Sequence, residues 1–420
     1  MADTTSSSEI HACPVGMLAD NFKLGNAELE AIYASARKED PVTYLPDIDF
    51  WAVTRFSDVK AILKDTTRFS CEIAMEPLVP FSAETVQCLK DGGFAGKSNL
   101  VANADVESHD RVRRLAQIGF VPKRMAELEP RIRALVDSTI DEFIGKKSVD
   151  LVEAMLYELP AKVLFMLLGI PDDEVGNVKR WADNRLLLIF GKLTKEKQLE
   201  AAHELVDYWQ YCIRHVESKK ASPGADLPSD MLASRNGDDS ILSMMDITLT
   251  VFGLLLAGHE TTSNMSANAV LALLENEGSW RKLHEDPDLI PNAVEELLRY
   301  RPSVVAWRRK TLEPVEIAGV QVPENSRLLL FLASANRDGD VFDDAEKLHL
   351  ERGNARSHIS FGFGAHFCLG APLARLELQI MLERLTQRIP DMRLTTPQEF
   401  SFIETIQFRG PAALQVEWST

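Results

Sequence analysis

One stretch of the chain, residues 240–277, contains no proline and has the residue pattern of a single long helix. At a rise of 1.5 Å per residue, such a helix is roughly 50 Å long and crosses a whole domain. The other elements must pack around it, so we expect a mainly α-helical fold. The best apolar run of the chain, residues 251–257, is far too short to span a bilayer.

The rest of the pattern predicts more helices and a small β portion. Two strand-like runs within residues 42–53 flank a Pro-Asp turn and predict a hairpin. Helical spacing broken by prolines dominates residues 105–222. We also expect helices at residues 289–300 and 372–387 and a mobile, glycine-containing loop at residues 72–101.

No Gly/Ser linker, repeat or low-complexity segment divides the chain. We therefore expect residues 1–20 to be a flexible N-terminal segment and residues 21–420 to form a single domain. The predicted fold class is mainly α with small β-sheets.

Charge and cysteine content narrow the class of protein. With 46 Lys+Arg against 63 Asp+Glu, the formal net charge is −17, which disfavours binding to nucleic acid or to an acidic membrane surface. The N-terminus has no signal-peptide pattern. The cysteines are an odd and scattered set, which favours a reducing compartment over a disulfide framework. We expect a soluble, cytoplasmic protein. The five cysteines are Cys13, Cys71, Cys88, Cys212 and Cys368.

A glycine-rich loop surrounds Cys368, which lies between Phe361, Gly364, His366 and Gly370. A predicted helix follows, so its N-terminal N–H groups favour an anionic sulfur. The glycines allow close approach to a flat group. A lone cysteine is more often a structural residue, and His366 with Cys368 supplies only two of the four ligands of a zinc site. A dinucleotide loop fails because position 367 is not glycine.

The spacing Phe361-x-x-Gly364-x-His366-x-Cys368-x-Gly370 resembles the heme-binding loop of the cytochrome P450 family. The resemblance implies that Cys368 is the axial thiolate ligand of the iron of heme b. It also implies that His366 reaches a heme propionate, that Gly364 and Gly370 make room for the macrocycle, and that Phe361 shields the sulfur.

A second motif lies near the middle of the predicted long helix. Gly253, Ala257 and Thr261 are four residues apart and share one face, where small side chains leave space for a ligand. Gly258 permits a kink. Glu260 is a titratable group beside the Thr261 hydroxyl.

Simpler interpretations exist for this motif. The hydroxyls of Thr261 and Thr262 can bond back to the preceding helical turn. A zinc-protease pattern fails, because Ser263 stands where a second histidine is needed. The motif also resembles the acid–alcohol pair of P450 monooxygenases. This implies catalytic roles in proton delivery to dioxygen for Thr261 and Glu260, with Ala257 beside the cofactor.

Glu296 and Arg299 lie three residues apart on a predicted helix, where such pairs are usually solvated. Their order in the chain matches the Glu-x-x-Arg element of the family. The resemblance implies a buried structural pair, with Arg352 as the third member.

Other basic residues are candidates for binding the carboxylates of a buried cofactor, which need charged partners. His109 and Arg113 share one face of a predicted helix and resemble the propionate-binding pair of the family. Arg309 follows the Glu-x-x-Arg helix, where the family supplies another arginine, and Arg308 is its close competitor.

The resemblance covers nearly the whole chain and implies a bacterial-type P450 fold and a heme-thiolate monooxygenase. Such an enzyme inserts one oxygen atom of O2 into a substrate, by hydroxylation or oxidative dealkylation. We expect electrons from a ferredoxin-type or flavodoxin-type donor with its own reductase. A peroxide-driven peroxygenase and a non-catalytic heme sensor are the alternatives. A basic patch for the donor is predicted at Arg111, Arg114, Lys123 and Arg124.

The expected substrate is a small or medium-sized apolar molecule, aromatic compounds included. Some segments resemble the heme domains of P450s that carry a fused reductase, which also favours alkylaromatics, aryl ethers or thiocarbamates. We predict that Gly253, Val304, Val305 and Phe402 line the substrate pocket.

Overall fold

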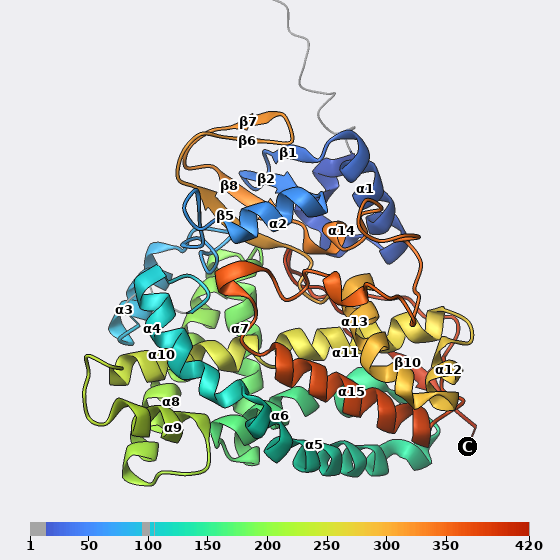
Figure 1. Cartoon of the computed structure of the whole chain (residues 1–420). Coiled ribbons are helices and arrows are strands. Elements are labelled where there is room, and N and C mark those ends of the chain that lie inside the picture. Colours follow the sequence, from blue (N-terminus) through green and yellow to red (C-terminus); the bar gives the residue numbers. More distant parts are fainter. Residues whose placement is uncertain (1–13, 95–100, 105, 420) are drawn as a thin grey trace, which may run out of the picture.

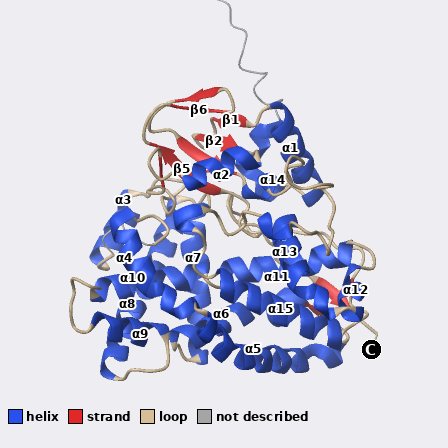
Figure 2. Cartoon of the chain, in the orientation of Figure 1, coloured by secondary structure: helices blue, strands red, loops and turns tan. Residues whose placement is uncertain are grey.

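The computed structural model describes residues 14–94, 101–104 and 106–419. Helices make up most of it (Figures 1 and 2). The prediction of a mainly α fold with small sheets is confirmed. The α-helices are α1 (Asn26–Glu39), α2 (Phe56–Lys64), α3 (Ala83–Asp91), α4 (Val106–Ala116), α5 (Pro122–Phe143), α6 (Leu159–Leu168), α7 (Val175–Phe190), α8 (Lys195–Ala221), α9 (Leu227–Arg235), α10 (Met244–Ala257), α11 (Glu260–Glu275), α12 (Ser279–Glu285), α13 (Ile290–Tyr300), α14 (Leu332–Ala335) and α15 (Ala371–Arg388).

The main sheet gathers at one end of the molecule with α1, α2 and α14 (Figure 1). Its strand order is β1-β2-β8-β5-β3, and smaller sheets pair β4-β10-β9 and β6-β7. The predicted hairpin is confirmed as the antiparallel pair β1–β2. The strands are β1 (Val42–Leu45), β2 (Phe50–Val53), β3 (Phe69–Ser70), β4 (Ser148–Asp150), β5 (Trp307–Thr311), β6 (Val315–Ile317), β7 (Val320–Val322), β8 (Arg327–Leu330), β9 (Arg393–Leu394) and β10 (Gln415–Glu417).

The predicted long helix is wrong in one respect, because the structure divides it into α10 and α11. Ser243 and Asp246 form a reciprocal capping box that starts α10. The helix ends at Ala257, since Gly258 and His259 interrupt it before α11 begins. A glycine weakens a helix because its backbone loses the most freedom on ordering. The interruption occurs beside the predicted acid–threonine motif.

Helices α11, α13 and α15 pack together in the interior, and α5 packs along α15. Their buried apolar residues belong to one large core cluster. Helices α7 and α8 lie against α10 and, with it, enclose the other side of the molecule. The loop before α15 and the α10–α11 junction therefore meet in the centre of the fold.

Two segments that were predicted to be flexible contain helical structure. Residues 14–20, predicted to be flexible, lie in a 3₁₀ helix (Pro14–Lys23) whose Val15 and Leu18 are buried. Residues 1–13 lie outside the described part. The predicted loop 72–101 contains helix α3, which begins with a Ser82 cap on the Thr85 N–H. Residues 95–100 of that prediction also lie outside the described part. None of the described helices has both the length and the apolar character that crossing a membrane requires.

Candidate active site

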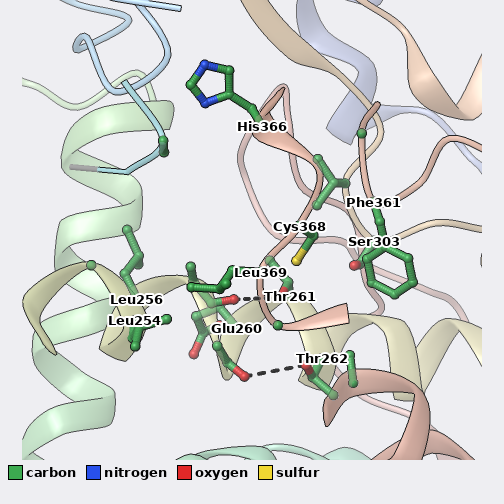
Figure 3. Close-up of a pocket in the computed structure, with 18 of the residues that line it drawn as sticks. Leu254, Leu256, Glu260, Thr261, Thr262, Ser303, Phe361, His366, Cys368 and Leu369 are labelled. Carbon is green, nitrogen blue, oxygen red and sulfur yellow. Dashed lines mark hydrogen bonds between the residues drawn. The ribbon is translucent and has the colours of Figure 1, made fainter. Parts of the chain in front are cut away.

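A largely apolar cavity lies between the cysteine loop and the α10–α11 junction (Figure 3). Cys368 lines it and is an exposed residue in the structure. Thr261, Glu260 and Ala257 line the same cavity. Two motifs that are more than 100 residues apart in the chain therefore meet at one site.

The cysteine loop turns sharply on its glycines. Gly362 and Gly364 both have positive φ, 74° and 75°, a conformation that glycine adopts without a steric penalty. The N–H of Cys368 donates to the Phe361 carbonyl at 2.8 Å, which closes the loop. Gly364 is not among the residues that line the cavity. A Cβ atom there would lie 3.0 Å from the Leu63 carbonyl oxygen of α2.

Burial raises the pKa of the Cys368 thiol. The N–H groups of Gly370 and Ala371 at the start of α15 and the nearby Arg113 act in the opposite direction. The protein groups alone therefore do not favour the thiolate form of Cys368 that we expected from the sequence. A metal ion bound to the sulfur would remove the proton outright, and the N–H groups would then stabilise the resulting anion.

Basic residues surround the other end of the loop. Arg113 and Arg309 line the cavity, and Arg113 also donates to the Phe367 carbonyl. The rings of His109 and His366 lie 4.3 Å apart. Burial, together with Arg309 and His109, lowers the pKa of His366 to about 4, so this ring is neutral near pH 7.

These residues fit a cofactor that carries carboxylates. The Nε2 atom of His109 is buried without a hydrogen-bond partner among the residues that the structure describes. Arg309 is 2% exposed and donates only to the carbonyl of the adjacent Arg308 among the hydrogen bonds of the described residues. Arg308 itself does not line the cavity and donates to the Glu76 carbonyl. Of the two competing arginines, the structure thus places Arg309 at the site.

The hydroxyls of the helix junction bond back to the preceding turn. Thr261 donates to the Ala257 carbonyl at 2.7 Å, and Thr262 donates to the Gly258 carbonyl at 3.4 Å. Both hydroxyls therefore form the bonds to the preceding helical turn that the simpler interpretation predicts. Thr261 nevertheless faces the cavity, and its oxygen can still accept a hydrogen bond.

Glu260 belongs to a buried network that the sequence did not reveal. It forms an ion pair with Lys179 of α7, and its Oε1 lies 3.0 Å from His259 Nδ1 without the angle of a hydrogen bond. Burial alone would raise the pKa of Glu260, but His259 and Lys179 outweigh it and hold the pKa well below its ordinary value. Glu260 is therefore ionised.

The network continues toward the surface through Asp183, also on α7. Burial and the charge of Glu260 raise the pKa of Asp183 to about 7. Asp183 accepts a hydrogen bond from Tyr157, whose side chain is 37% exposed, and the Lys179 ammonium lies 3.6 Å from the Tyr157 ring centroid. Helical spacing of Lys179 and Asp183 on α7 was the only signal in the sequence.

Glu377 of α15 is another functional candidate that sequence reasoning missed. It lines the cavity and is 2% exposed, and no described residue forms a hydrogen bond with its Oε1. Burial raises its pKa to about 8, so the carboxyl is neutral near pH 7. The only indication in the sequence was the position of Glu377 among the apolar residues of α15.

The supporting ion pair is fully buried. Arg299 donates to both carboxylate oxygens of Glu296 at 2.7 and 2.8 Å, and Arg352 Nε lies 3.0 Å from Glu296 Oε2. Arg299 also donates to the carbonyls of Asn336, Ala345 and Lys347. The structure therefore brings all three predicted members together and ties α13 to the segment that precedes the cysteine loop.

The predicted pocket residues divide into two groups. Gly253 and Val304 line the cavity. Val305 and Phe402 do not: Val305 is buried in a separate core cluster, and Phe402 packs under the Arg409 guanidinium at 3.5 Å. Val304 and Val305 follow one another in an extended segment, so they point to opposite sides. Aromatic and aliphatic residues that the prediction omitted also line the cavity, among them Trp307, Phe408 and Leu256.

The predicted basic patch is partly neutralised. Arg111 pairs with Asp246 at 2.8 Å, and Arg124 pairs with Asp230. Arg114 and Lys123 are exposed. This surface therefore offers two unpaired cations among the four that were predicted, within the described part of the chain.

Comparison with known proteins agrees with this geometry. The cytochrome P450 family model matches residues 176–389. The chain is 34% identical over 390 residues to cytochrome P450 107B1 of Saccharopolyspora erythraea, covering 91% of this chain and 93% of that protein. It is also similar to two solved structures. One is cytochrome P450 CREJ in complex with (4-ethylphenyl) dihydrogen phosphate, with a TM-score of 0.89, 37% identity, and coverage of 92% of this chain and 96% of that one.

The other is the CYP116B5 heme domain of Acinetobacter radioresistens, with a TM-score of 0.91, 35% identity, and coverage of 97% and 99%. The family resemblance expected from the cysteine loop is thereby confirmed over nearly the whole length. The chain belongs to the cytochrome P450 family and is a monooxygenase with heme b as its cofactor.

Proposed function

We propose that this enzyme inserts one atom of O2 into a small or medium-sized apolar substrate held above the heme, by hydroxylation or oxidative dealkylation. One observation carries the proposal: Cys368 and the Glu260–Thr261 pair line the same apolar cavity. A sensor needs only the first of these features, whereas oxygen insertion needs both.

Heme bound through Cys368 supplies the activation of dioxygen, which no side chain of the chain can perform. We propose that Arg113, Arg309 and His109 hold the heme carboxylates. Arg113 and Arg309 line the cavity, and His109 has a buried nitrogen without a partner in the described part of the chain. The N–H groups at the start of α15 orient the sulfur and offset its negative charge.

We propose that protons reach the cavity along α7. Tyr157 is partly exposed, Asp183 exchanges protons near pH 7, and Glu260 is buried beside it. Lys179 holds the Glu260 carboxylate in an ion pair in the present arrangement. Release of this ion pair would let Glu260 turn toward Thr261, whose hydroxyl then passes the proton on.

The lining of the cavity supports an apolar and partly aromatic substrate. Trp307, Phe190 and Phe408 contact one another there, with ring centroids 5.0 to 6.5 Å apart. Rings in edge-to-face arrangements pack well against an aromatic guest. The similar protein CREJ has been solved with an alkylphenyl phosphate, which agrees with an alkylaromatic body.

For the electron supply we propose a separate ferredoxin-type or flavodoxin-type donor with its reductase, in the cytoplasm. Arg114 and Lys123 are exposed and form no ion pair with any described residue, and they fit an acidic donor surface. Substitution of both by Gln should raise the donor concentration needed for half-maximal turnover at low salt without changing substrate binding.

The test begins with the reduced carbon monoxide spectrum of the purified holoprotein. We expect a strongly red-shifted Soret band that is lost in Cys368→Ala. Turnover of alkylaromatic substrates is then compared with surrogate redox proteins plus NADPH and with hydrogen peroxide. Faster turnover with peroxide would overturn the proposed donor, and no turnover with either over the substrate panel would favour a sensor.

A further inference from the structure

A buried arginine lines the cavity in a part that the heme-binding residues do not explain. Arg185 lies on α7 and is 2% exposed. It donates to the Phe252 carbonyl of α10 at 2.6 Å, and its guanidinium carbon lies 3.7 Å from the centroid of the Phe252 ring. The Tyr208 hydroxyl donates to the same carbonyl at 3.0 Å. These contacts fix the position of the side chain without supplying a negative charge.

Arg185 has no counter-ion among the side chains that the structure describes, since no carboxylate oxygen lies within 4.0 Å of its nitrogens. Two other buried cations of this protein do have a counter-ion. Lys179, six residues earlier on the same helix, pairs with Glu260, and Arg299 pairs with Glu296. A buried charge without an opposite charge is costly by several kcal/mol, so folds rarely keep one without a use.

The position of Arg185 separates it from the cofactor-binding arginines. Arg113 bonds to the cysteine loop, and Arg309 lies on strand β5. Arg185 instead contacts α10 near Gly253, where the cavity is lined by apolar residues of α7 and α10, among them Leu186 and Leu249. These are elements on which the substrate body is expected to rest.

The other titratable groups at the cavity do not neutralise Arg185. Glu260 is already paired with Lys179, and Glu377 is neutral near pH 7 because burial raises its pKa. The phenol of Tyr208 is likewise neutral, since burial raises its pKa well above the ordinary value. An anion that neutralises Arg185 must therefore enter with the ligand.

We propose that Arg185 binds an anionic group, a carboxylate or a phosphate monoester, at one end of an otherwise apolar substrate. The planar guanidinium offers several N–H donors in a fork that matches both anions. The apolar body then extends along α7 and α10 toward Cys368. This inference rests on the proposed function and narrows its substrate class to amphipathic acids.

The test measures binding rather than turnover. The purified ferric holoprotein is titrated with three probes of one shape, namely 4-butylbenzoate, 4-butylphenyl phosphate and the neutral 4-butylbenzamide. The optical spin-state shift and calorimetry both report the dissociation constant. We expect at least one anion to bind tenfold or more tightly than the amide. The comparison of the two anions shows which acid the site prefers.

Variants then identify the residue. In Arg185→Met we expect the preferred anion to bind about 30-fold more weakly, a 2 kcal/mol loss at 1.4 kcal/mol per factor of ten. The amide should change by less than threefold, and Arg185→Lys should retain part of the preference for the anion. Arg180→Met is the matched control, because Arg180 lies on the same helix but is exposed and pairs with Glu204.

Equal or weaker binding of both anions compared with the amide in the wild-type protein overturns the inference, whatever the variants show. So does an anion preference that survives in Arg185→Met. The reduced carbon monoxide band is recorded for every sample. If that band is present while the anion preference is absent, the inference about Arg185 fails and the proposed monooxygenase function stands.

Discussion

Replacing Glu377 by Gln should stabilise the enzyme, and the gain should depend on pH. Glu377 is buried, its Oε1 has no partner within the described ranges, and burial moves its pKa from 4.5 to about 8. The folded protein therefore keeps a proton that the unfolded chain releases above pH 4.5. By linkage, the unfolding free energy falls as the pH rises from about 4.5 to 8 and then levels off.

The size of the effect follows from the pKa values. At pH 7 the unfolded group is about 2.5 pH units above its pKa, which at 1.36 kcal/mol per unit is about 3 kcal/mol. A glutamine of the same shape cannot ionise in either state. The variant therefore does not lose this unfolding free energy as the pH rises. With an unfolding entropy of about 2.1 cal/mol/K per residue over 420 residues, 1 kcal/mol corresponds to about 1 °C. The variant should therefore melt about 3 °C higher at pH 7 than the wild type.

The assay is thermal unfolding of both holoproteins at pH 5, 6, 7 and 8. The difference in melting temperature should be about 1 °C at pH 5 and should grow toward pH 8. Glu383→Gln is the control on the same helix, because Glu383 is partly exposed and paired with Arg133. A difference for Glu377→Gln that is the same at all four pH values would refute the reasoning, since the carboxyl would then titrate alike in the folded and unfolded states.

Three further predictions concern the frame and the proton path. Arg299→Lys should lower the melting temperature by about 3 °C, because lysine cannot bond Glu296 and three carbonyls at once and a broken buried pair costs about 3 kcal/mol; an unchanged melting curve would contradict this. Glu260→Gln should slow oxygen-driven turnover about 100-fold and raise the hydrogen peroxide formed per NADPH, with substrate dissociation constants unchanged. In the wild type, turnover should fall as the pH rises through about 7, where Asp183 loses its proton. Asp183→Asn should be slower and lack this step, and an identical pH profile would exclude Asp183 from the path.

Local motifs were predictable because their chemistry depends on neighbours in the chain. The cysteine loop needs glycine at a position with positive φ, and the sequence shows one at Gly364. The Glu296–Arg299 pair lies one helical turn apart, so its geometry follows from the helix. The break at Gly258 was only half predicted. The glycine indicated a weak point, but whether the helix ends there depends on the packing of the junction against other elements.

Long-range partners and side-chain directions could not be predicted in the same way. Lys179 meets Glu260 only because α7 packs against α10, and no local pattern indicates that packing. Adjacent residues in extended segments face opposite sides, so a shift of one residue reverses an assignment. For this reason Val304 lines the cavity but Val305 does not, and Arg309 lines it but Arg308 does not.

The charges at the cavity explain why a buried arginine can be retained there. Among the described residues, Arg113 and Arg309 lie where the carboxylates of the cofactor are expected, and Glu260 is paired with Lys179. A neutral substrate would leave Arg185 buried and uncompensated in every catalytic cycle, with nothing gained from its desolvation. With an acidic substrate, the exclusion of water instead strengthens the ion pair between the Arg185 guanidinium and the acid group. This contact would hold one end of the molecule and thereby select which carbon faces Cys368.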